Sequence, residues 1–255
     1  MSSAGIRRTK ASIITAVLNG AEHIGRTLDS VADQDHADVE HVIADGGSTD
    51  GTLELIRAHR GGTARIISGR DSGVYEAFNK GLEAATGDVI AYLNCGDTYE
   101  TRSAVSKSLF ELDAYGVDAA FADVLIVDAL RQSRVVRRYS SRRFTPGAMP
   151  FGFMPAHPTL FLRRRVYEEA GRYDPEFRIA GDFEFCVRVF IGRNTSYRYI
   201  PEALVRMPRG GLSNRGWRSK WEITKEMRRA CRVHRVSTNW AKLCLRIPLK
   251  LAELA

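Results

Sequence analysis

The sequence lacks the features of a cross-linked, zinc-binding or membrane-spanning chain. Its four cysteines lie far apart and none forms a CxxC pair, which favours neither a disulfide framework nor a zinc site and fits a reducing compartment. No run of about 18 apolar residues occurs, so no transmembrane helix is expected. The basic residues 1–10 are not followed by the apolar stretch of a secretory signal. We therefore expect a cytoplasmic protein.

Two glycine-rich nucleotide-binding motifs are missing as well. The sequence contains neither GxGxxG nor GxxxxGK[ST], so neither a dinucleotide-binding fold nor a P-loop is supported. Positive charge is concentrated at one end: residues 206–255 carry 13 lysines and arginines against 3 acidic residues, a net +10, whereas the whole chain carries +8. Residues 1–205 therefore sum to −2. A nucleic-acid-binding domain would more often spread basic side chains over its folded body, so we expect no nucleic-acid partner.

The length of 255 residues fits one large α/β domain with a tail. In the first half, β-branched and apolar runs alternate with patterns of helical period. Such alternation predicts a mostly parallel sheet with helices on both faces. The expected strands cover residues 12–18, 39–44, 64–68 and 89–93. The expected helices cover residues 22–34 and 74–85, with another that begins at a Ser48 or Thr49 cap and runs through Ile56.

The second half is less regular. Residues 119–127 predict one long strand or a pair of strands, and residues 140–155 are typical of a loop. Helical patterns cover residues 164–170 and 183–191. We divide the chain into a flexible N-terminus at 1–9, a main domain at 10–214 and a basic helical tail at 215–255.

Polar residues follow the expected strands at equal spacing. Asn19, Asp45, Asp71 and Asp97 are 26 residues apart, and each stands just after a strand, which indicates similar crossover lengths. The carboxyl ends of parallel strands share one edge, and ligands of open α/β sheets bind outside that edge. We therefore expect these four side chains to meet in one crevice.

Two of these positions also have a plain structural interpretation. Residues 44–52 (ADGGSTDGT) form either a turn that lets the backbone approach a ligand closely or an ordinary capped turn. Asp71 is either a site residue or the cap of the helix that follows, because carboxylates are favoured at helix N-termini. Asn79 lies two turns along that helix and can face the same crevice.

Three further positions carry candidate chemistry. Asp97, with Asn94 nearby, stands where a carboxylate would hold Mg²⁺ or Mn²⁺ against substrate phosphates, although one Asp and one Asn are a weak metal signal. Asp182 opens a helix in GDFEF and is either a helix cap or a general base. His157, before a proline, is either a structural residue or part of the site.

Together these motifs resemble the family 2 glycosyltransferases of the GT-A fold. The matching strings are LNGAEHI, ADGGSTDGT, DSGVYEAFNKGLEAATGDVIAYLNCGD, AHPTLFLRR and AGDFEF, in the family's order over about residues 10–215. The resemblance implies a Rossmann-like sheet flanked by helices and a nucleotide-sugar donor. It also implies that Asp45 contacts the nucleotide base, that Asp71 lies near the base or ribose, that Asp97 is the metal ligand and that Asp182 is the catalytic base.

The donor-binding residues predicted from the motifs and the resemblance are Asn19, Asp45, Asp71, Asn79, Asn94 and His157. The segment 210–214 (GGLSN) resembles a loop that closes over the donor. One position departs from the family pattern: Gly96 precedes Asp97 where many relatives carry a second acidic residue. Fewer protein carboxylates would then hold the metal.

The implied reaction follows from charge. Departure of the nucleoside diphosphate builds negative charge, which Mg²⁺ or Mn²⁺ at Asp97 would neutralise. Asp182 would take the proton of an acceptor hydroxyl. One base and a single displacement predict inversion at the anomeric carbon. We expect a carbohydrate or lipid-linked acceptor, in the synthesis of a cell-surface polysaccharide or a glycolipid.

The tail has an amphipathic pattern. Trp217 and Trp221 are spaced i,i+4, and Lys242, Arg246 and Lys250 share another face. An apolar stripe contains Trp240, Leu243, Cys244, Ile247, Leu251 and Leu254. This pattern fits either an interfacial helix on an anionic membrane or a helix docked on the core with a solvated basic face. Because we expect a lipid-linked acceptor, we favour the first alternative, in which the tail binds the inner face of the cell membrane.

Two alternatives from other classes remain open. A sugar-nucleotide nucleotidyltransferase uses a related sheet, but its Gly-rich, Arg-containing loop is missing at Leu18-Asn19-Gly20-Ala21. A nucleic-acid binder could act through the basic tail. Neither alternative accounts for the ordered carboxylates at the strand ends.

Overall fold

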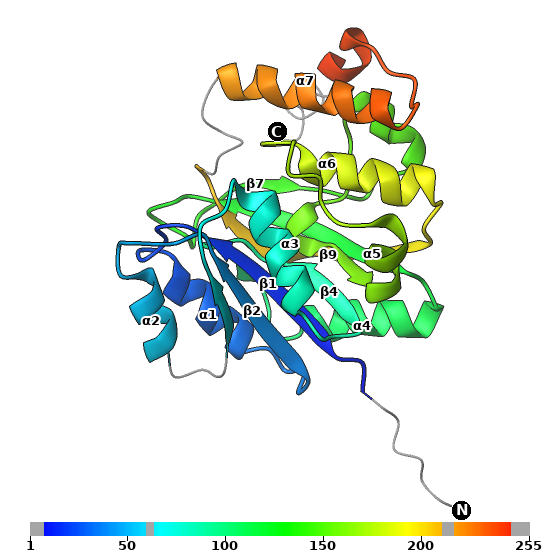
Figure 1. The fold of residues 1–255 in the computed structure, drawn as a ribbon. Coiled ribbons are helices and arrows are strands. Elements are labelled where there is room, and N and C mark those ends of the chain that lie inside the picture. Colours follow the sequence, from blue (N-terminus) through cyan, green and yellow to red (C-terminus); the bar gives the residue numbers. More distant parts are fainter. Residues whose placement is uncertain (1–7, 60–63, 211–216, 246–255) are drawn as a thin grey trace, which may run out of the picture.

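The computed structural model describes residues 8–59, 64–210 and 217–245, and within them nine strands form one mixed sheet (Figure 1). The strand order is β3-β2-β1-β4-β8-β6-β9-β5, and β7 pairs with β6 outside this path. The strands are β1 (Ala11–Val17), β2 (Val39–Asp45), β3 (Arg65–Ser68), β4 (Val89–Tyr92), β5 (Thr98–Tyr99), β6 (Ala119–Val127), β7 (Val135–Tyr139), β8 (Phe161–Arg163) and β9 (Tyr197–Pro208).

Helices cover both faces of this sheet, as expected (Figure 1). The α-helices are α1 (Ile24–Ala32), α2 (Thr52–Ala58), α3 (Val74–Ala84), α4 (Ala104–Tyr115), α5 (Arg164–Ala170), α6 (Gly181–Cys186) and α7 (Trp217–Val233). Two short 3₁₀ helices, η1 (Pro146–Phe151) and η2 (His157–Thr159), precede β8, and α6 continues into a π-helical turn, η3 (Val187–Gly192).

The first half of the sheet is parallel. Strands β3, β2, β1 and β4 pair in parallel, and the register aligns Val17 with Asp45 and Asp45 with Ser68. The carboxyl ends of β1, β2 and β3 therefore share one edge. The second half is mixed, because β8 runs antiparallel to both β4 and β6 while β9 runs parallel to β6. The parallel strands of the mostly parallel sheet that we expected thus lie mainly in its first half.

The start of one helix differs from the prediction, because the side chains expected to cap it are hydrogen-bonded elsewhere. Helix α2 begins at Thr52 after Gly51, whose φ is 91°, and no side chain caps it at that position. The predicted Ser48 or Thr49 cap is therefore wrong. Helix α3 ends at Ala84, one residue before the expected end at residue 85. A Cβ at Gly87 would lie 2.6 Å from the backbone nitrogen of Ser12, so a close strand contact, and not helix termination, requires this glycine.

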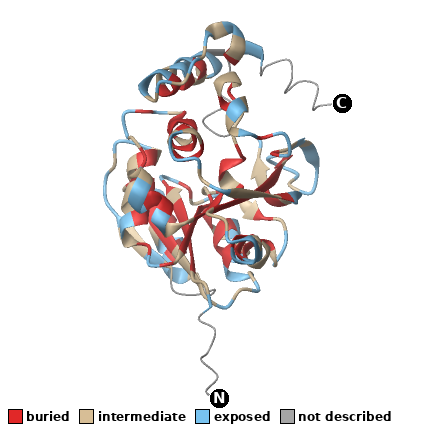
Figure 2. Ribbon diagram, turned by 90° about the vertical axis from the view of Figure 1, so that its right-hand side faces the viewer, coloured by how far each residue is buried: buried red, intermediate tan, exposed pale blue. Residues whose placement is uncertain are grey.

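The tail is docked on the main domain as far as it is described. Met227, Ala230 and Cys231 of α7, and Leu243 in the helical turn after it, are buried in the same cluster as Tyr75. Figure 1 shows α7 lying against α6, and Figure 2 shows buried residues on the side of α7 that faces the body. Of the alternatives for the tail, docking holds for residues 217–245. The remaining stripe residues Ile247, Leu251 and Leu254 lie outside the described residues.

No helix among residues 8–59, 64–210 and 217–245 combines the length and the apolar character needed to cross a bilayer.

Candidate active site

The loops after β1 and β2 are hydrogen-bonded to each other. The backbone N–H of Thr49 donates to Asn19 Oδ1 at 2.9 Å, and the N–H of Asn19 donates to Ser48 Oγ at 2.8 Å. The N–H of Gly20 donates to Thr52 Oγ1 at 2.9 Å. These bonds explain why Ser48 and Thr49 do not cap α2. They give Asn19 the role of joining two loops at the site edge, and its predicted contact with a donor stays a prediction.

Asp45, the last residue of β2, is buried and held by donors around it. Its carboxylate accepts the backbone N–H groups of Gly47 and Ser48 and the hydroxyl of Ser68, the last at 2.7 Å. Burial acts to raise the pKa of Asp45, but the hydrogen bonds from Ser48 and Ser68 outweigh it and lower that pKa. The group is therefore a fixed negative charge at the strand end.

Asp71 lies directly against the loop that follows Asp45. A Cβ at Gly46 would lie 2.7 Å from Asp71 Oδ2, so only glycine lets the carboxylate approach this backbone. Burial raises the pKa of Asp71, Lys80 opposes that shift, and Asp45 adds to it. Asp71 also accepts the N–H of Gly73 at 3.2 Å, just before α3 begins. The structure thus brings together the predicted residues Asn19, Asp45 and Asp71.

Asp97 follows β4 and carries an unsatisfied oxygen. Its side chain is 5% exposed, and Oδ2 is buried with no hydrogen-bond partner among the described residues. Burial raises the pKa of Asp97 to about 8, although hydrogen bonds from Asn94 act in the opposite direction. The backbone of this turn is fixed on α1, because Thr27 Oγ1 donates to the Asp97 carbonyl and accepts the N–H of Gly96. A buried polar atom without a partner is rare, and a divalent cation would satisfy it.

Asp182 opens α6 and meets residues from two other elements. Its Oδ1 accepts the backbone N–H of Phe183 at 2.8 Å and the hydroxyl of Tyr75 at 3.4 Å. Gly181 makes the second contact possible, because a Cβ there would lie 2.7 Å from the Tyr75 ring. Burial raises the pKa of Asp182, and His157 opposes that shift. Since Tyr75 sits on α3 just after Asp71, residues 71–75 join the strand-end carboxylates to Asp182.

The carboxylate of Glu184, the other acidic residue of GDFEF, is already bound to two basic side chains. It is 3% exposed, and its carboxylate accepts Arg188 Nη2 at 2.8 Å and contacts His234 Nε2 at 2.6 Å. The ion pair with Arg188 spans one turn of the same helix. Glu184 therefore ties α6 to its own next turn and to the segment after α7.

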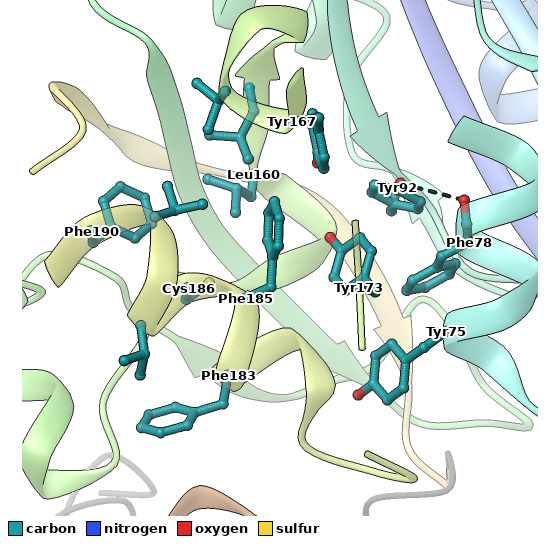
Figure 3. Packing of buried hydrophobic residues seen from close by; sticks show 14 of the residues in the cluster. Tyr75, Phe78, Tyr92, Leu160, Tyr167, Tyr173, Phe183, Phe185, Cys186 and Phe190 are labelled. Carbon is teal, nitrogen blue, oxygen red and sulfur yellow. Dashed lines mark hydrogen bonds between the residues drawn. The ribbon is translucent and has the colours of Figure 1, made fainter. Parts of the chain in front are cut away.

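His157 and Asn79 contact an aromatic cluster that contains Phe78 and Tyr173, both drawn in Figure 3. His157 Nε2 is 2.8 Å from the hydroxyl of Tyr173, and its ring stacks on Phe78 at 5.7 Å. Burial lowers the pKa of His157, while the charge of Asp182 raises it. Asn79 is bound on both amide atoms by the backbone of Tyr173, at 2.8 and 3.0 Å. In this structure both residues support the packing below Asp182, and their predicted donor contacts stay predictions.

Two residues of this edge were not predicted from the sequence: Ser68, which donates to Asp45, and Tyr75, which donates to Asp182. Tyr75 was visible as an aromatic residue inside the DSGVYEAF string, four positions after Asp71. Its partner lies 107 residues away in sequence, so no local pattern could have paired them. Ser68 carried no signal beyond standing at a strand end.

The described residues hold no group of three or more His, Cys, Asp or Glu side chains arranged to bind a metal. Two surface hollows, of about 270 and 320 Å³, are lined by other residues, among them Asp118 and Arg193 in the first and His36 and His59 in the second. Neither is lined by a predicted site residue. The candidate site is the strand-end edge itself. Of the GGLSN segment, only Gly210 lies among the described residues.

Comparison with known proteins identifies the family. The family model for glycosyl transferase family 2 matches residues 12–171. A "PGL/p-HBAD biosynthesis glycosyltransferase" of Mycobacterium bovis is 32% identical over 213 residues, covering 80% of this chain and 78% of that protein. The chain belongs to glycosyl transferase family 2. A glycosyltransferase of Mycobacterium tuberculosis is 29% identical to this transferase over 182 residues, covering 69% of the chain and 67% of that protein.

Solved structures confirm the GT-A fold of this transferase. S. aureus TarS 1-349, in complex with UDP-GlcNAc, matches with a TM-score of 0.68 at 17% identity, over 88% of this chain and 66% of that one. The mannosyltransferase PcManGT from Pyrobaculum calidifontis, in complex with GDP-Man and Mn²⁺, matches with a TM-score of 0.65 at 15% identity, over 98% of this chain and 82% of that one. The chain thus spans just under two thirds of the TarS fragment.

Proposed function

We propose that this glycosyltransferase moves a sugar from a nucleoside-diphosphate sugar to an acceptor hydroxyl, with inversion, and that Asp182 is the general base. The observation that carries the proposal is the hydrogen bonding of the Asp182 carboxylate, which uses one of its two oxygens. Both hydrogen bonds that it accepts from described residues end on Oδ1, which leaves Oδ2 to take a proton. Burial raises the pKa of this group, and a base is most effective when its pKa approaches the working pH.

The acceptor side of the reaction follows from this geometry. The acceptor hydroxyl would donate its proton to Asp182 Oδ2 as its oxygen attacks the anomeric carbon. Glu184 would not compete, because Arg188 and His234 already occupy its carboxylate. One base acting in a single displacement would transfer the sugar with inversion.

The donor side would use Asp45, Asp71 and Asp97. Asp45 and Asp71 lie together at the strand ends and would receive the nucleoside. The unsatisfied Oδ2 of Asp97 fits a Mg²⁺ or Mn²⁺ ligand, and the ion would supply the positive charge that the departing diphosphate needs. Support comes from two proteins of the same fold, one in complex with UDP-GlcNAc and the other with GDP-Man and Mn²⁺.

The acceptor that we propose is a glycolipid precursor or another lipid-linked carbohydrate. The relative from Mycobacterium bovis that is 32% identical to this chain is named for PGL/p-HBAD biosynthesis. The outer face of α7 suits an anionic membrane surface: Trp221 is 51% exposed and stacks on Trp240 at 4.8 Å. Lys225 lies over the Trp221 ring and Arg228 over the Trp240 ring. Cations beside an exposed tryptophan, here Trp221, and a half-buried one, Trp240, suit the headgroup region.

Ligand-induced stabilisation tests this function directly. A panel of nucleotide sugars with and without Mn²⁺ should contain a donor that raises the unfolding temperature, since a ligand at 100 times its Kd stabilises by about 2.7 kcal/mol. In Asp97→Ala the Mn²⁺-dependent part of this shift should disappear. In the control Asp33→Ala, an exposed carboxylate at the end of α1, the shift should stay. A panel in which no nucleotide sugar stabilises the protein, or an unchanged Mn²⁺ effect in Asp97→Ala, would contradict the proposal.

A further inference from the structure

Helix α7 contacts the segment that leads into Asp182 through one carboxylate. Glu226 accepts three successive backbone N–H groups: Arg178 at 3.0 Å on Oε1, Ile179 at 2.9 Å on Oε2, and Ala180 at 2.8 Å on Oε2. Ala180 is the residue before α6, and no side chain of α6 itself caps this end. A carboxylate at a helix start satisfies orphan N–H groups and suits the helix dipole. The residues that lead into the helix of Asp182 are therefore held by a side chain that lies 46 to 48 residues further along the chain.

The same segment is held from the opposite side. Tyr75 donates its hydroxyl to the Ile179 carbonyl at 2.8 Å and to Asp182 Oδ1 at 3.4 Å. The peptide groups around Ile179 thus have their N–H groups bound by α7 and a carbonyl bound by α3. If the Glu226 carboxylate were removed, the backbone around Ile179 would keep its hydrogen bond from the Tyr75 hydroxyl but lose the acceptor of its N–H groups.

Neighbouring contacts of α7 bracket Asp182 along the sequence. Arg229 forms an ion pair with Glu176 and stacks over Phe177 at 4.7 Å, on the N-terminal side. His234 lies 2.6 Å from Glu184, on the C-terminal side. The Glu226 and His234 contacts lie equally near Asp182 in sequence, two residues before it and two residues after it. Glu226 differs because it binds backbone N–H groups of the segment that leads into α6, whereas His234 contacts the side chain of Glu184.

We propose that Glu226 is a positioning residue: its carboxylate fixes residues 178–180 so that Asp182 faces the acceptor hydroxyl. The inference rests on the proposed role of Asp182 as the base. Glu226 acts through the backbone and does not touch the substrate. Catalytic groups must be held within a fraction of an ångström, and a displacement of about 1 Å can lower a rate by about 10²-fold. The tail helix is therefore part of the catalytic apparatus of this enzyme.

The test compares Glu226→Ala with Glu222→Ala in the full-length protein. Glu222 lies one turn earlier on α7, is exposed and pairs with Lys225, so it is the matched control. We expect Glu226→Ala to lower kcat by about 10- to 100-fold while the donor KM changes less than about twofold. Glu222→Ala should keep the wild-type values. If Glu226 only anchors α7, Glu226→Ala will lower the unfolding temperature while kcat per folded molecule stays at the wild-type value, and the proposal is then wrong.

A conservative variant keeps the test decisive if Glu226→Ala does not fold. Glu226→Gln retains one oxygen for the N–H groups of Ile179 and Ala180 but turns an NH₂ group toward the N–H of Arg178. Its kcat should fall by about 3- to 10-fold, between the wild type and the alanine variant. A wild-type kcat in Glu226→Gln would overturn the proposal.

A double-mutant cycle separates this inference from the proposed function. If Glu226 works only through Asp182, Glu226→Ala or, where that does not fold, Glu226→Gln should change kcat less than about twofold in an Asp182→Asn background, because residues acting as a unit are non-additive. An additive loss would contradict the positioning role. Full activity in Asp182→Asn alone would instead remove the proposed base, and with it the premise of this inference.

Discussion

Replacing Leu243 by alanine should destabilise the whole protein, although this residue lies in the basic tail. Its side chain is 0% exposed and packs in the core cluster that contains Tyr75 and Phe185. Removing a fully buried leucine side chain loses its transfer free energy and leaves a cavity, and together these lower the free energy of unfolding by about 2–5 kcal/mol. For a chain of this size, each kcal/mol lowers the unfolding temperature by about 2–4 °C.

Leu245 provides the matched control two residues further on. It is 51% exposed, so Leu245→Ala should change the free energy of unfolding by less than about 0.5 kcal/mol. Urea denaturation followed by circular dichroism measures both variants, and the slope with denaturant should stay the same. Equal stability of Leu243→Ala and Leu245→Ala would refute the docking of the tail on the main domain.

Two further predictions concern the site and the surface. The kcat of the transferase should fall as pH drops through the pKa of Asp182, because the base must be ionised. Burial raises that pKa while His157 and Tyr75 oppose the shift, so a pH–rate profile should place the midpoint above about 4, the ordinary value for aspartate; a midpoint at or below that value would contradict the burial argument. Replacing Lys225 and Arg228 together by alanine should weaken binding to vesicles containing phosphatidylserine by about 30-fold, from about 1 kcal/mol per cation. Equal binding of this variant and the wild type in a sedimentation assay would remove the membrane role of α7.

The parallel half of the fold could be predicted because its signals are local. Each of β1, β2 and β3 is a short strand followed by a turn and a helix, and the spacing of Asn19, Asp45 and Asp71 matched the edge that the structure shows. The failures have local causes too. Ser48 and Thr49 look like helix caps in sequence, but Asn19 and its loop bind them instead.

The second half could not be predicted in the same way. Strand β9 (Tyr197–Pro208) pairs with β6, more than 70 residues earlier, and its sequence YRYIPEALVRMP contains two prolines and three charged residues. The sequence does not predict the docking of α7, because a stripe of Trp and Leu beside cations fits a membrane surface and a protein core equally well. The structure decides it by burying Met227, Ala230 and Cys231 in the main core, against residues far away in sequence.

The most direct test of the account compares Asp182→Asn with Glu184→Gln. Both changes preserve shape and remove the carboxylate charge from the same helix. Transfer should be measured with the donor that stabilises the protein, together with donor affinity. We predict that Asp182→Asn lowers kcat by about 10²-fold or more with donor binding nearly unchanged, whereas Glu184→Gln mainly lowers stability, because Arg188 and His234 lose their charged partner. A Glu184→Gln variant without activity beside an Asp182→Asn variant with normal turnover would contradict the assignment of the base.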